Sequence, residues 1–230
     1  MFKHSSSNPN LARDIVAQAS KFFLCADQAR GTSGKSIRKI RWEKPEVGWM
    51  KLNTDGALNS LLGLAGGGGL ISDEVGRWVA GFARKIGKAN SFLAELWALR
   101  DGLLLCQQMN VTALVIEVDA KALVDALINP SYSNAVVYGL FDDCRQLVNR
   151  LPQFWIKHVF HEANMCADQL ARLGYLLVSD FTLYSCLPVD IMKIFEADSQ
   201  GLFSSRLCTD PFYFNASLPS YQKKNNNKKK

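Results

Sequence analysis

The pattern of apolar and polar residues changes near Val47. Before that point, apolar residues recur at helical spacing over 10–29, which predicts one amphipathic helix. Residues 30–44 are rich in Gly, Ser and basic residues, a composition typical of a mobile basic linker. From Trp49 onward apolar and polar residues alternate, so a folded domain is predicted to begin there.

Three strands followed by alternating helices and strands are predicted for this domain. The first strand runs from Met50 to Asp55, and the next two form a hairpin around the turn at 72–76. A run without alternation predicts a long helix over 91–109, with Ser91 placed to cap its start. The remaining predicted elements are a buried strand over 113–118, helices over 120–128 and 134–150, a strand over 153–160 and a helix over 163–177. This order predicts an α/β domain with a mixed sheet and helices on its faces.

The pattern is lost after Ser179, where prolines interrupt an aromatic-rich stretch and the chain ends in KKNNNKKK. We therefore predict three parts: a basic N-terminal helix and linker over 1–47, a folded domain over 48–178, and a poorly structured extension with a Lys/Asn-rich basic tail over 179–230.

The positive charge of the chain belongs to its flanks. The formal net charge of +6 divides into +5 for residues 1–47, −1 for 48–178 and +2 for 179–230. Basic flanks around a neutral domain are expected if they contact nucleic-acid phosphates, and equally if they are only solvated tails. The terminal lysines have the same two interpretations, with a nuclear-import signal as a third.

Composition excludes several classes of protein. A content of 48% hydrophobic and 21% charged residues is that of an ordinary soluble globular protein. No stretch approaches the roughly 18 apolar residues of a membrane-spanning helix, and the first residues do not form a secretory signal. We therefore expect an intracellular protein of the nucleus or cytoplasm that has no membrane partner. The six cysteines include no CxxC pair, so we interpret them as reduced thiols rather than zinc or redox sites.

Four carboxylates occupy the ends or starts of predicted elements. Asp55 lies near the end of the first strand, Glu95 in the first turns of the long helix, Asp119 after the 113–118 strand, and Asp168 near the start of the last helix. Ligand sites of α/β sheets form beyond the carboxyl ends of strands, and oxygen ligands alone suit Mg²⁺ or Mn²⁺. Three of the acids also have a structural interpretation: a turn at Asp55, a helix cap at Asp119, and a favoured helix N-terminal position for Glu95.

Five motifs together carry a specific resemblance: KLNTDGA (51–57), GGGLISDEVGRWVAGF (67–82), AELWALRDGL (94–103), VIEVDA (115–120) and HEANMCADQLARLG (161–174). The sequence resembles the type 1 ribonuclease H family, particularly the domains of plant non-LTR retroelement reverse transcriptases, over residues 48 to about 178. The resemblance implies a ribonuclease H-like fold with a five-stranded mixed sheet, three antiparallel strands followed by two parallel ones, and helices on both faces.

The resemblance also implies an activity, the metal-dependent hydrolysis of the RNA strand of RNA–DNA hybrids by an endoribonuclease. The family's four metal-binding acids fall on Asp55, Glu95, Asp119 and Asp168, which would hold two Mg²⁺ ions, with Mn²⁺ as a substitute. Two such ions about 4 Å apart can activate a water and stabilise the leaving 3′ oxygen. The expected partner is the hybrid alone, bound by a monomer without a small-molecule cofactor.

Further residues are assigned by the same resemblance. His158 matches the place of a family histidine that would shuttle a proton during product release; His161 is a second candidate, and a plain structural role for His158 is an alternative. Contacts with the substrate, including the 2′-hydroxyls of RNA, would come from Gly56, Asn90, Ser91 and Asn164. The alternative is that these residues only form turns or cap helices.

Two departures from the family pattern predict weaker binding of the substrate. Only NPSYS separates the helices that end near Ile128 and begin at Asn134, where some relatives carry an extra basic helix. Residues 1–47 also lack the pattern of a hybrid-binding domain. An alternative function is therefore that of a domesticated or decaying retroelement-derived module, which binds nucleic acid or a protein partner without turnover.

Overall fold

The computed structural model describes residues 36–129, 131–132, 136–208 and 220–223. The helix predicted over 10–29 lies outside these residues. The described residues from Arg38 to Arg206, together with 220–223, belong to one compact unit, and Ser36, Ile37, Leu207 and Cys208 fall in a second unit. The description that follows concerns the larger unit.

A mixed sheet forms the centre of this unit. Its strands are β2 (Met50–Asn59), β3 (Leu64–Ser72), β4 (Trp78–Gly87), β5 (Ala113–Val118), β6 (Gln153–His158), β7 (Phe181–Tyr184) and β9 (Ser220–Lys223). Within the described residues the order is β7-β4-β3-β2-β5-β6-β9, with β5 parallel to both β2 and β6 and all other pairs antiparallel. The predicted arrangement of three antiparallel and two parallel strands is confirmed. The predicted count of five is wrong, because β7 and β9 add one strand to each edge.

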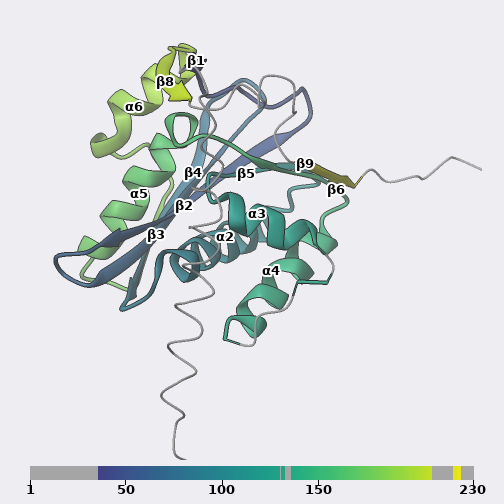
Figure 1. Cartoon of the computed structure of the whole chain (residues 1–230). Coiled ribbons are helices and arrows are strands. Elements are labelled where there is room, and N and C mark those ends of the chain that lie inside the picture. The colour runs from purple at the N-terminus through teal and green to yellow at the C-terminus, as the bar shows by residue number, and fades with distance from the viewer. Residues whose placement is uncertain (1–35, 130, 133–135, 209–219, 224–230) are drawn as a thin grey trace, which may run out of the picture. The chain divides into compact units, whose positions relative to one another are not determined.

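Helices cover both faces of the sheet, as predicted. They are α2 (Ser91–Gln108), α3 (Lys121–Ile128), α4 (Tyr138–Arg150), α5 (Met165–Leu176) and α6 (Val189–Ser199), with a short 3-10 helix η1 (His161–Ala163) before α5. In Figure 1, α5 and α6 lie on one side of the sheet and α2, α3 and α4 on the other. Helix α4 begins at Tyr138, later than the predicted Asn134; residues 133–135 lie outside the described part.

The glycine run in β3 lets helices approach the sheet closely from both sides. A Cβ at Gly68 would lie 2.7 Å from the Leu170 Cβ in α5, and a Cβ at Gly67 would lie 3.2 Å from the Ala98 Cβ in α2. Successive residues of a strand face opposite sides of a sheet, so alternate glycines make room for different helices. Helix α5 is thereby brought directly against β3 and β2.

The segment after Ser179 is more ordered than the sequence predicted. It contains β7, α6 and β8 (Ser204–Cys208), and β8 pairs with β1 (Ser36–Ile40) in a separate two-stranded sheet. Ile191 of α6 is fully buried and packs with Leu70 and Leu170 in a second hydrophobic cluster. The sequence did not predict α6 because an 11-residue helix gains its stability from packing on α5 rather than from its own periodicity.

The predicted basic linker over 30–44 is also ordered in its described part. Residues 36–40 form β1, and the indole of Trp42 is buried. None of the helices in the described ranges is long and apolar enough to span a membrane.

Candidate active site

Asp55 lies in the middle of a strand rather than at its end. Strand β2 continues to Asn59, and Asp55 pairs with Gly68 of β3, whereas the parallel pairing of β2 with β5 ends at Thr54. The predicted turn at Gly56 is wrong, because the glycine-rich β3 supplies a pairing partner for the continuation of β2. Asp55 therefore lies just past the point where β2 and β5 separate, and Asp119 follows β5 there.

Glu95 is positioned by the close contact between α2 and β2. The Asn90 side chain caps α2 by accepting a hydrogen bond from the Leu93 amide at 2.8 Å, so the predicted capping role of Ser91 is wrong. A Cβ at Gly56 would lie 2.5 Å from the Ala94 carbonyl carbon and 2.8 Å from the Glu95 Cα. Only glycine permits this approach, which brings the first turns of α2 beside Asp55.

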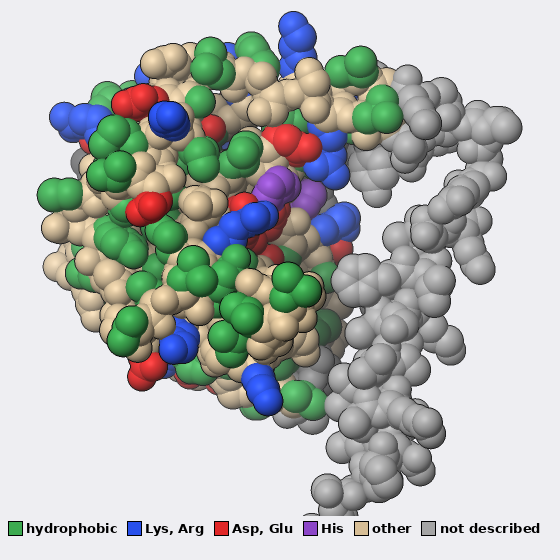
Figure 2. All heavy atoms as spheres, turned by 90° about the vertical axis from the view of Figure 1, so that its left-hand side faces the viewer, with side chains coloured by type: hydrophobic (Ala, Val, Ile, Leu, Met, Phe, Trp, Pro, Cys, Tyr) green, Lys and Arg blue, Asp and Glu red, His purple; other side chains and the backbone are tan. Residues whose placement is uncertain are grey.

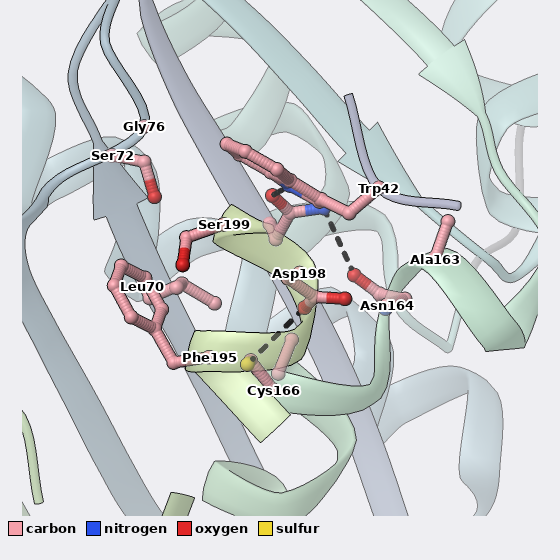
Figure 3. A pocket seen from close by; sticks show the side chains of 12 residues that line it. Trp42, Leu70, Ser72, Gly76, Ala163, Asn164, Cys166, Phe195, Asp198 and Ser199 are labelled. Atoms are coloured by element: carbon pink, nitrogen blue, oxygen red, sulfur yellow. Dashed lines mark hydrogen bonds between the residues drawn. The ribbon is translucent and has the colours of Figure 1, made fainter. Parts of the chain in front are cut away.

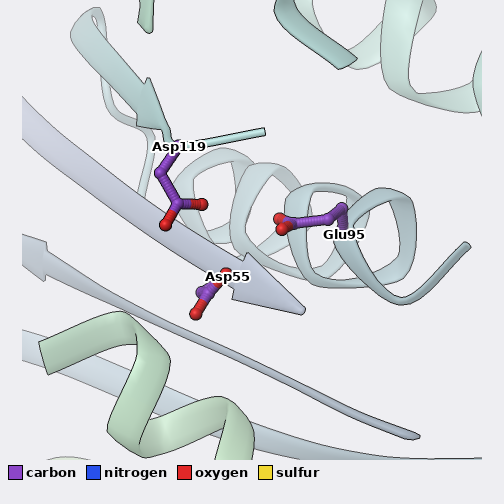
Figure 4. Close-up of side chains that lie close together, drawn as sticks. All are labelled: Asp55, Glu95 and Asp119. Atoms are coloured by element: carbon purple, nitrogen blue, oxygen red, sulfur yellow. The ribbon is translucent and has the colours of Figure 1, made fainter. Parts of the chain in front are cut away.

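Three of the predicted carboxylates converge. One carboxylate oxygen from each of Asp55, Glu95 and Asp119 lies within 4.8 Å of the others, and Figure 4 shows the three side chains meeting from β2, α2 and the end of β5. Asp55 is 5% exposed and Glu95 7% exposed. The helix-capping interpretation of Asp119 is not supported, since α3 has no side-chain cap.

Burial and mutual repulsion disfavour ionisation of this cluster. Burial, followed by the charges of Asp119 and Asp168, raises the pKa of Asp55 well above its usual value, and burial followed by the Asp55 charge does the same for the pKa of Glu95. Burial also raises the pKa of Asp119, although the nearby His161 opposes that shift. Oε2 of Glu95 is buried without a hydrogen-bond partner among the described residues. A dense, oxygen-only donor set with an unpaired buried oxygen fits a hard divalent cation, which would neutralise the repulsion.

The fourth predicted acid reaches the same place but is paired with a cation. Asp168 lies in the first turn of α5, and its two carboxylate oxygens are 2.9 and 3.0 Å from Nε of Arg172, one helical turn later. Asp168 is close enough for its charge to raise the pKa of Asp55. The structure thus brings all four acids to one site, three in direct proximity and Asp168 at its side.

The acids line an open hollow of about 420 Å³, whose walls are Asp55, Gly56, Ala57, Leu58, Glu95, Asp119, Ala120, His161, Asp168, Arg172 and Tyr175. In Figure 2, acidic, basic and histidine side chains gather in the middle of one face of the molecule. Of the four predicted substrate contacts, only Gly56 lines this hollow. Asn90 and Ser91 are exposed at the start of α2, beyond its walls. Arg172 and Tyr175 were not singled out from the sequence, although they follow Asp168 at i+4 and i+7 and so share its helix face.

The two histidines differ in their relation to Asp119. His161 of η1 lines the hollow, and its Nδ1 lies 3.4 Å from the Asp119 carboxylate. His158 ends β6, and its Nε2 lies 3.1 Å from the Asp119 carbonyl oxygen, while its buried Nδ1 has no partner among the described residues. Burial lowers the pKa of His158. The structure therefore brings His161 into the hollow, whereas the predicted His158 does not line it.

Asn164 is buried beneath the site. Its Nδ2 donates a hydrogen bond to the Thr54 carbonyl oxygen at 2.9 Å, and its Oδ1 accepts one from Asn53 Nδ2 at 3.1 Å. Because both ends of the amide are used inside the protein, this arrangement argues against the predicted contact of Asn164 with substrate.

Comparisons with known proteins agree with this geometry. A family model described as reverse transcriptase-like matches residues 53–174. A protein of Arabidopsis thaliana described as a candidate ribonuclease H protein is 33% identical over 170 residues, which cover 74% of this chain and 27% of that protein. The chain thus spans about a quarter of the length of that relative.

Solved structures of ribonucleases H are similar in fold. Ribonuclease H1 of Halobacterium salinarum is 24% identical with a TM-score of 0.51, over 55% of this chain and 96% of the other. The N-terminal ribonuclease H domain of a Mycobacterium tuberculosis protein is 21% identical with a TM-score of 0.51, over 55% and 93%. A compost-derived ribonuclease H1 in complex with an RNA/DNA hybrid is 22% identical with a TM-score of 0.50, over 55% and 96%. The chain therefore belongs to the reverse transcriptase-like family, and its central part has the ribonuclease H fold.

Proposed function

We propose that the chain is a metal-dependent endoribonuclease that hydrolyses the RNA strand of RNA–DNA hybrids. The observation that carries this proposal is the convergence of buried carboxylates from β2, α2 and β5 within 4.8 Å, in a hollow open to a large substrate. The ribonuclease H fold supports the class of reaction, and one protein of similar fold is described with an RNA/DNA hybrid.

Asp55, Glu95, Asp119 and Asp168 would hold two Mg²⁺ ions, for which Mn²⁺ can substitute. Bound there, the pair of cations supplies an activated water and stabilises the charge that develops on the leaving 3′ oxygen. The Gly56 amide donates a hydrogen bond to Asp55 Oδ1 at 2.9 Å and thereby fixes the orientation of this carboxylate toward the cluster.

Arg172 and His161 are the groups of the hollow suited to contact the substrate. The Arg172 guanidinium is about half exposed and already neutralises Asp168. If Asp168 turns toward a cation, Arg172 is freed to bind a phosphate of the RNA strand, for which its planar fork of donors is well suited. His161 is also half exposed, so it can reach the leaving group, whereas His158 contacts the backbone of Asp119.

Selection of RNA over DNA requires contact with 2′-hydroxyls. The Gly56 backbone in the wall of the hollow and the exposed Asn90 and Ser91 at the start of α2 are the groups that we assign to this contact. Asn90 Oδ1 is used by the helix cap, which leaves its Nδ2 as the group for the RNA strand.

The alternative function, nucleic-acid binding without turnover, is favoured by one observation. Asp168 pairs with Arg172 instead of joining the three-carboxylate cluster. If that ion pair persists with a cation bound, the metal site has only three acids.

A cleavage assay separates the two functions. End-labelled RNA–DNA hybrid, duplex RNA and duplex DNA are incubated with the full chain, with and without Mg²⁺, beside the Asp119→Asn variant as a matched control. Mg²⁺-dependent cleavage of the hybrid alone, lost in Asp119→Asn, is the expected result. Binding of the hybrid without cleavage at any Mg²⁺ or Mn²⁺ concentration would establish the alternative instead.

A further inference from the structure

A layer of buried polar side chains lies directly beneath the carboxylates. Its members are Lys51 and Asn53 of β2, Glu117 of β5 and Asn164, the residue before α5; each is between 2% and 6% exposed. The alternating pattern of β2 and β5 would ordinarily turn such residues toward water. Here they are covered, and the indole of Trp42 closes the layer from the segment that precedes β2.

Asn53 is the centre of the layer. Its Oδ1 accepts a hydrogen bond from Trp42 Nε1 at 3.0 Å, and its Nδ2 donates to Glu117 Oε2 at 3.2 Å and to Asn164 Oδ1 at 3.1 Å. Figure 3 shows the bond to Asn164 beside the Trp42 ring. Lys51 Nζ is 2.5 Å from Glu117 Oε1. The side-chain amide of Asn53 is therefore fully hydrogen-bonded inside the protein.

The layer connects the three elements that carry the aspartates of the site. Asn53 and Glu117 face each other in the parallel ladder of β2 and β5. Asp55 follows Asn53 by two residues within β2 and so lies on the same face of the sheet, and Asp119 follows Glu117 by two residues, one position past the end of β5. The Asn164 carbonyl oxygen accepts a hydrogen bond from the Asp168 amide at 3.1 Å, and its side chain is tied to β2. Each aspartate thus follows a member of the layer by two or four residues.

The acids repel one another, so something must oppose their separation. Carboxylate oxygens of Asp55, Glu95 and Asp119 lie within 4.8 Å of one another, and like charges at this spacing oppose the close approach of β2, α2 and the end of β5. A fully satisfied polar network is directional, and in a dry environment it defines one arrangement more strictly than apolar packing does. The buried Lys51–Glu117 pair adds little net stability once desolvation is counted, which fits a role in specifying geometry.

We propose that this buried polar layer of Lys51, Asn53, Glu117 and Asn164, closed by Trp42, holds the carboxylates at the spacing that a divalent cation requires. These are positioning residues that act through Asp55, Asp119 and Asp168. The inference rests on the proposed function, and it makes the segment before β2 a working part of the metal site.

Two variants loosen the layer without touching the acids. Trp42→Phe keeps an aromatic ring near Lys51 but removes the N–H that reaches Asn53 together with part of the indole. Asn164→Ser removes the bonds to Asn53 and Thr54. Leu147→Ala on the opposite face, in α4, is the matched control, because it destabilises the core without contacting the layer.

The measurement is calorimetric binding of Mn²⁺ to the full chain, with hybrid cleavage measured over a range of Mn²⁺ concentrations. We expect the dissociation constant for Mn²⁺ to rise about threefold to tenfold in Trp42→Phe and at least as much in Asn164→Ser, from the usual strength of one hydrogen bond. High Mn²⁺ should restore cleavage in Trp42→Phe, and KM for the hybrid should stay near the value of the unmodified chain. Leu147→Ala should bind Mn²⁺ as the unmodified chain does.

Equal Mn²⁺ affinity in the unmodified chain and Trp42→Phe would overturn the proposal, as would an equal loss of affinity in Leu147→Ala. If Asn164→Ser does not fold, Trp42→Phe alone decides. An unmodified chain that neither binds Mn²⁺ nor cleaves the hybrid would refute the proposed function itself, whereas one that does both, together with unaffected variants, would refute only the role of the layer.

Discussion

Gly56 is the position where one added methyl group tests the link between packing and catalysis most directly. In Gly56→Ala, the new Cβ would lie 2.5 Å from the Ala94 carbonyl carbon and 2.8 Å from the Glu95 Cα, whereas ordinary contacts begin near 3.4 Å. The neighbouring atoms belong to the backbone, so no side-chain rotation relieves the clash. Helix α2 and strand β2 must separate by roughly 1 Å, at a cost of about 1–3 kcal/mol in the free energy of unfolding.

This separation moves Glu95 away from Asp55, because the two acids belong to the two elements that are forced apart. A misplacement of about 1 Å at a reacting centre can lower the rate by about a hundredfold. We therefore expect kcat/KM for hybrid cleavage to fall by about that factor in a protein that still folds, and binding of Mn²⁺ to weaken with it.

Gly67→Ala is the matched control for this variant. Gly67 pairs with Gly56 across the β2–β3 ladder, but its Cβ would meet the side-chain atoms Ala98 Cβ at 3.2 Å and Ile86 Cδ1 at 3.3 Å. Ile86 Cδ1 can rotate aside, and the Ala98 contact is short by only a few tenths of an ångström, so α2 need shift far less than in Gly56→Ala and most of the activity should remain. Steady-state cleavage and urea unfolding of both variants provide the measurement. Unchanged kcat/KM in Gly56→Ala, or an equal loss in both variants, would refute the reasoning.

Five further substitutions have defined outcomes. Asp119→Asn should abolish Mg²⁺-dependent cleavage without lowering the melting temperature of the metal-free protein, because it removes a charge that raises the pKa of Asp55 and Glu95. Differential scanning fluorimetry without metal measures that melting temperature. His161→Ala should lower kcat by about tenfold or more and His158→Ala much less, since only His161 lines the hollow. A larger loss of kcat in His158→Ala than in His161→Ala, measured by steady-state kinetics, would identify His158 as the functional histidine. Ile191→Ala should lower the free energy of unfolding by about 2–5 kcal/mol in urea titrations, because Ile191 is fully buried between α5 and α6. Burial raises the pKa of Asp198 from its ordinary value of 3.8 to about 6, so the folded state keeps a proton that the unfolded chain has already released. The stability that this proton provides is lost as the pH rises from about 4 to 6. Asp198→Asn should therefore raise the melting temperature near pH 7.5 and leave it unchanged near pH 4.

The elements that the sequence predicted best are those whose pattern has a local cause. Strand β5 occupies the predicted residues 113–118, because a short apolar run bounded by polar residues has few alternatives to a buried strand. Helix α2 begins at the predicted residue, where Asn90 and not Ser91 supplies the cap. Two neighbouring residues with capping side chains make the start of a helix predictable but not the choice between them.

Tertiary contacts decided the features that the sequence did not reveal. A glycine after Asp55 is usually interpreted as a turn, and only the pairing of Gly56 with Gly67 shows that β2 continues. The polar residues of β2 were assigned to one face of the strand, but nothing in the alternation indicates that Asn53 is buried by Trp42 from a segment predicted to be a linker. The spacing of His158 and His161 from Asp168 likewise gave no reason to prefer the histidine that lines the hollow.

The packing also determines which part of the chain can be used to examine the basic flanks. A domain cut at residues 48 and 178 would remove the Trp42 donor to Asn53 at one end and the α6 cover of Leu70 and Leu170 at the other. It would also remove Arg206, whose Nη1 lies 2.9 Å from the carboxylate of Glu162, the neighbour of His161 in η1. A loss of hybrid affinity in such a fragment would therefore combine lost phosphate contacts with a loosened site. A fragment that retains residues 38–206 keeps the contacts of the carboxylates and of the buried layer, including the Trp42 bond to Asn53 and the Arg206–Glu162 ion pair. Only with such a fragment does a change in hybrid affinity measure the charge of the flanks alone.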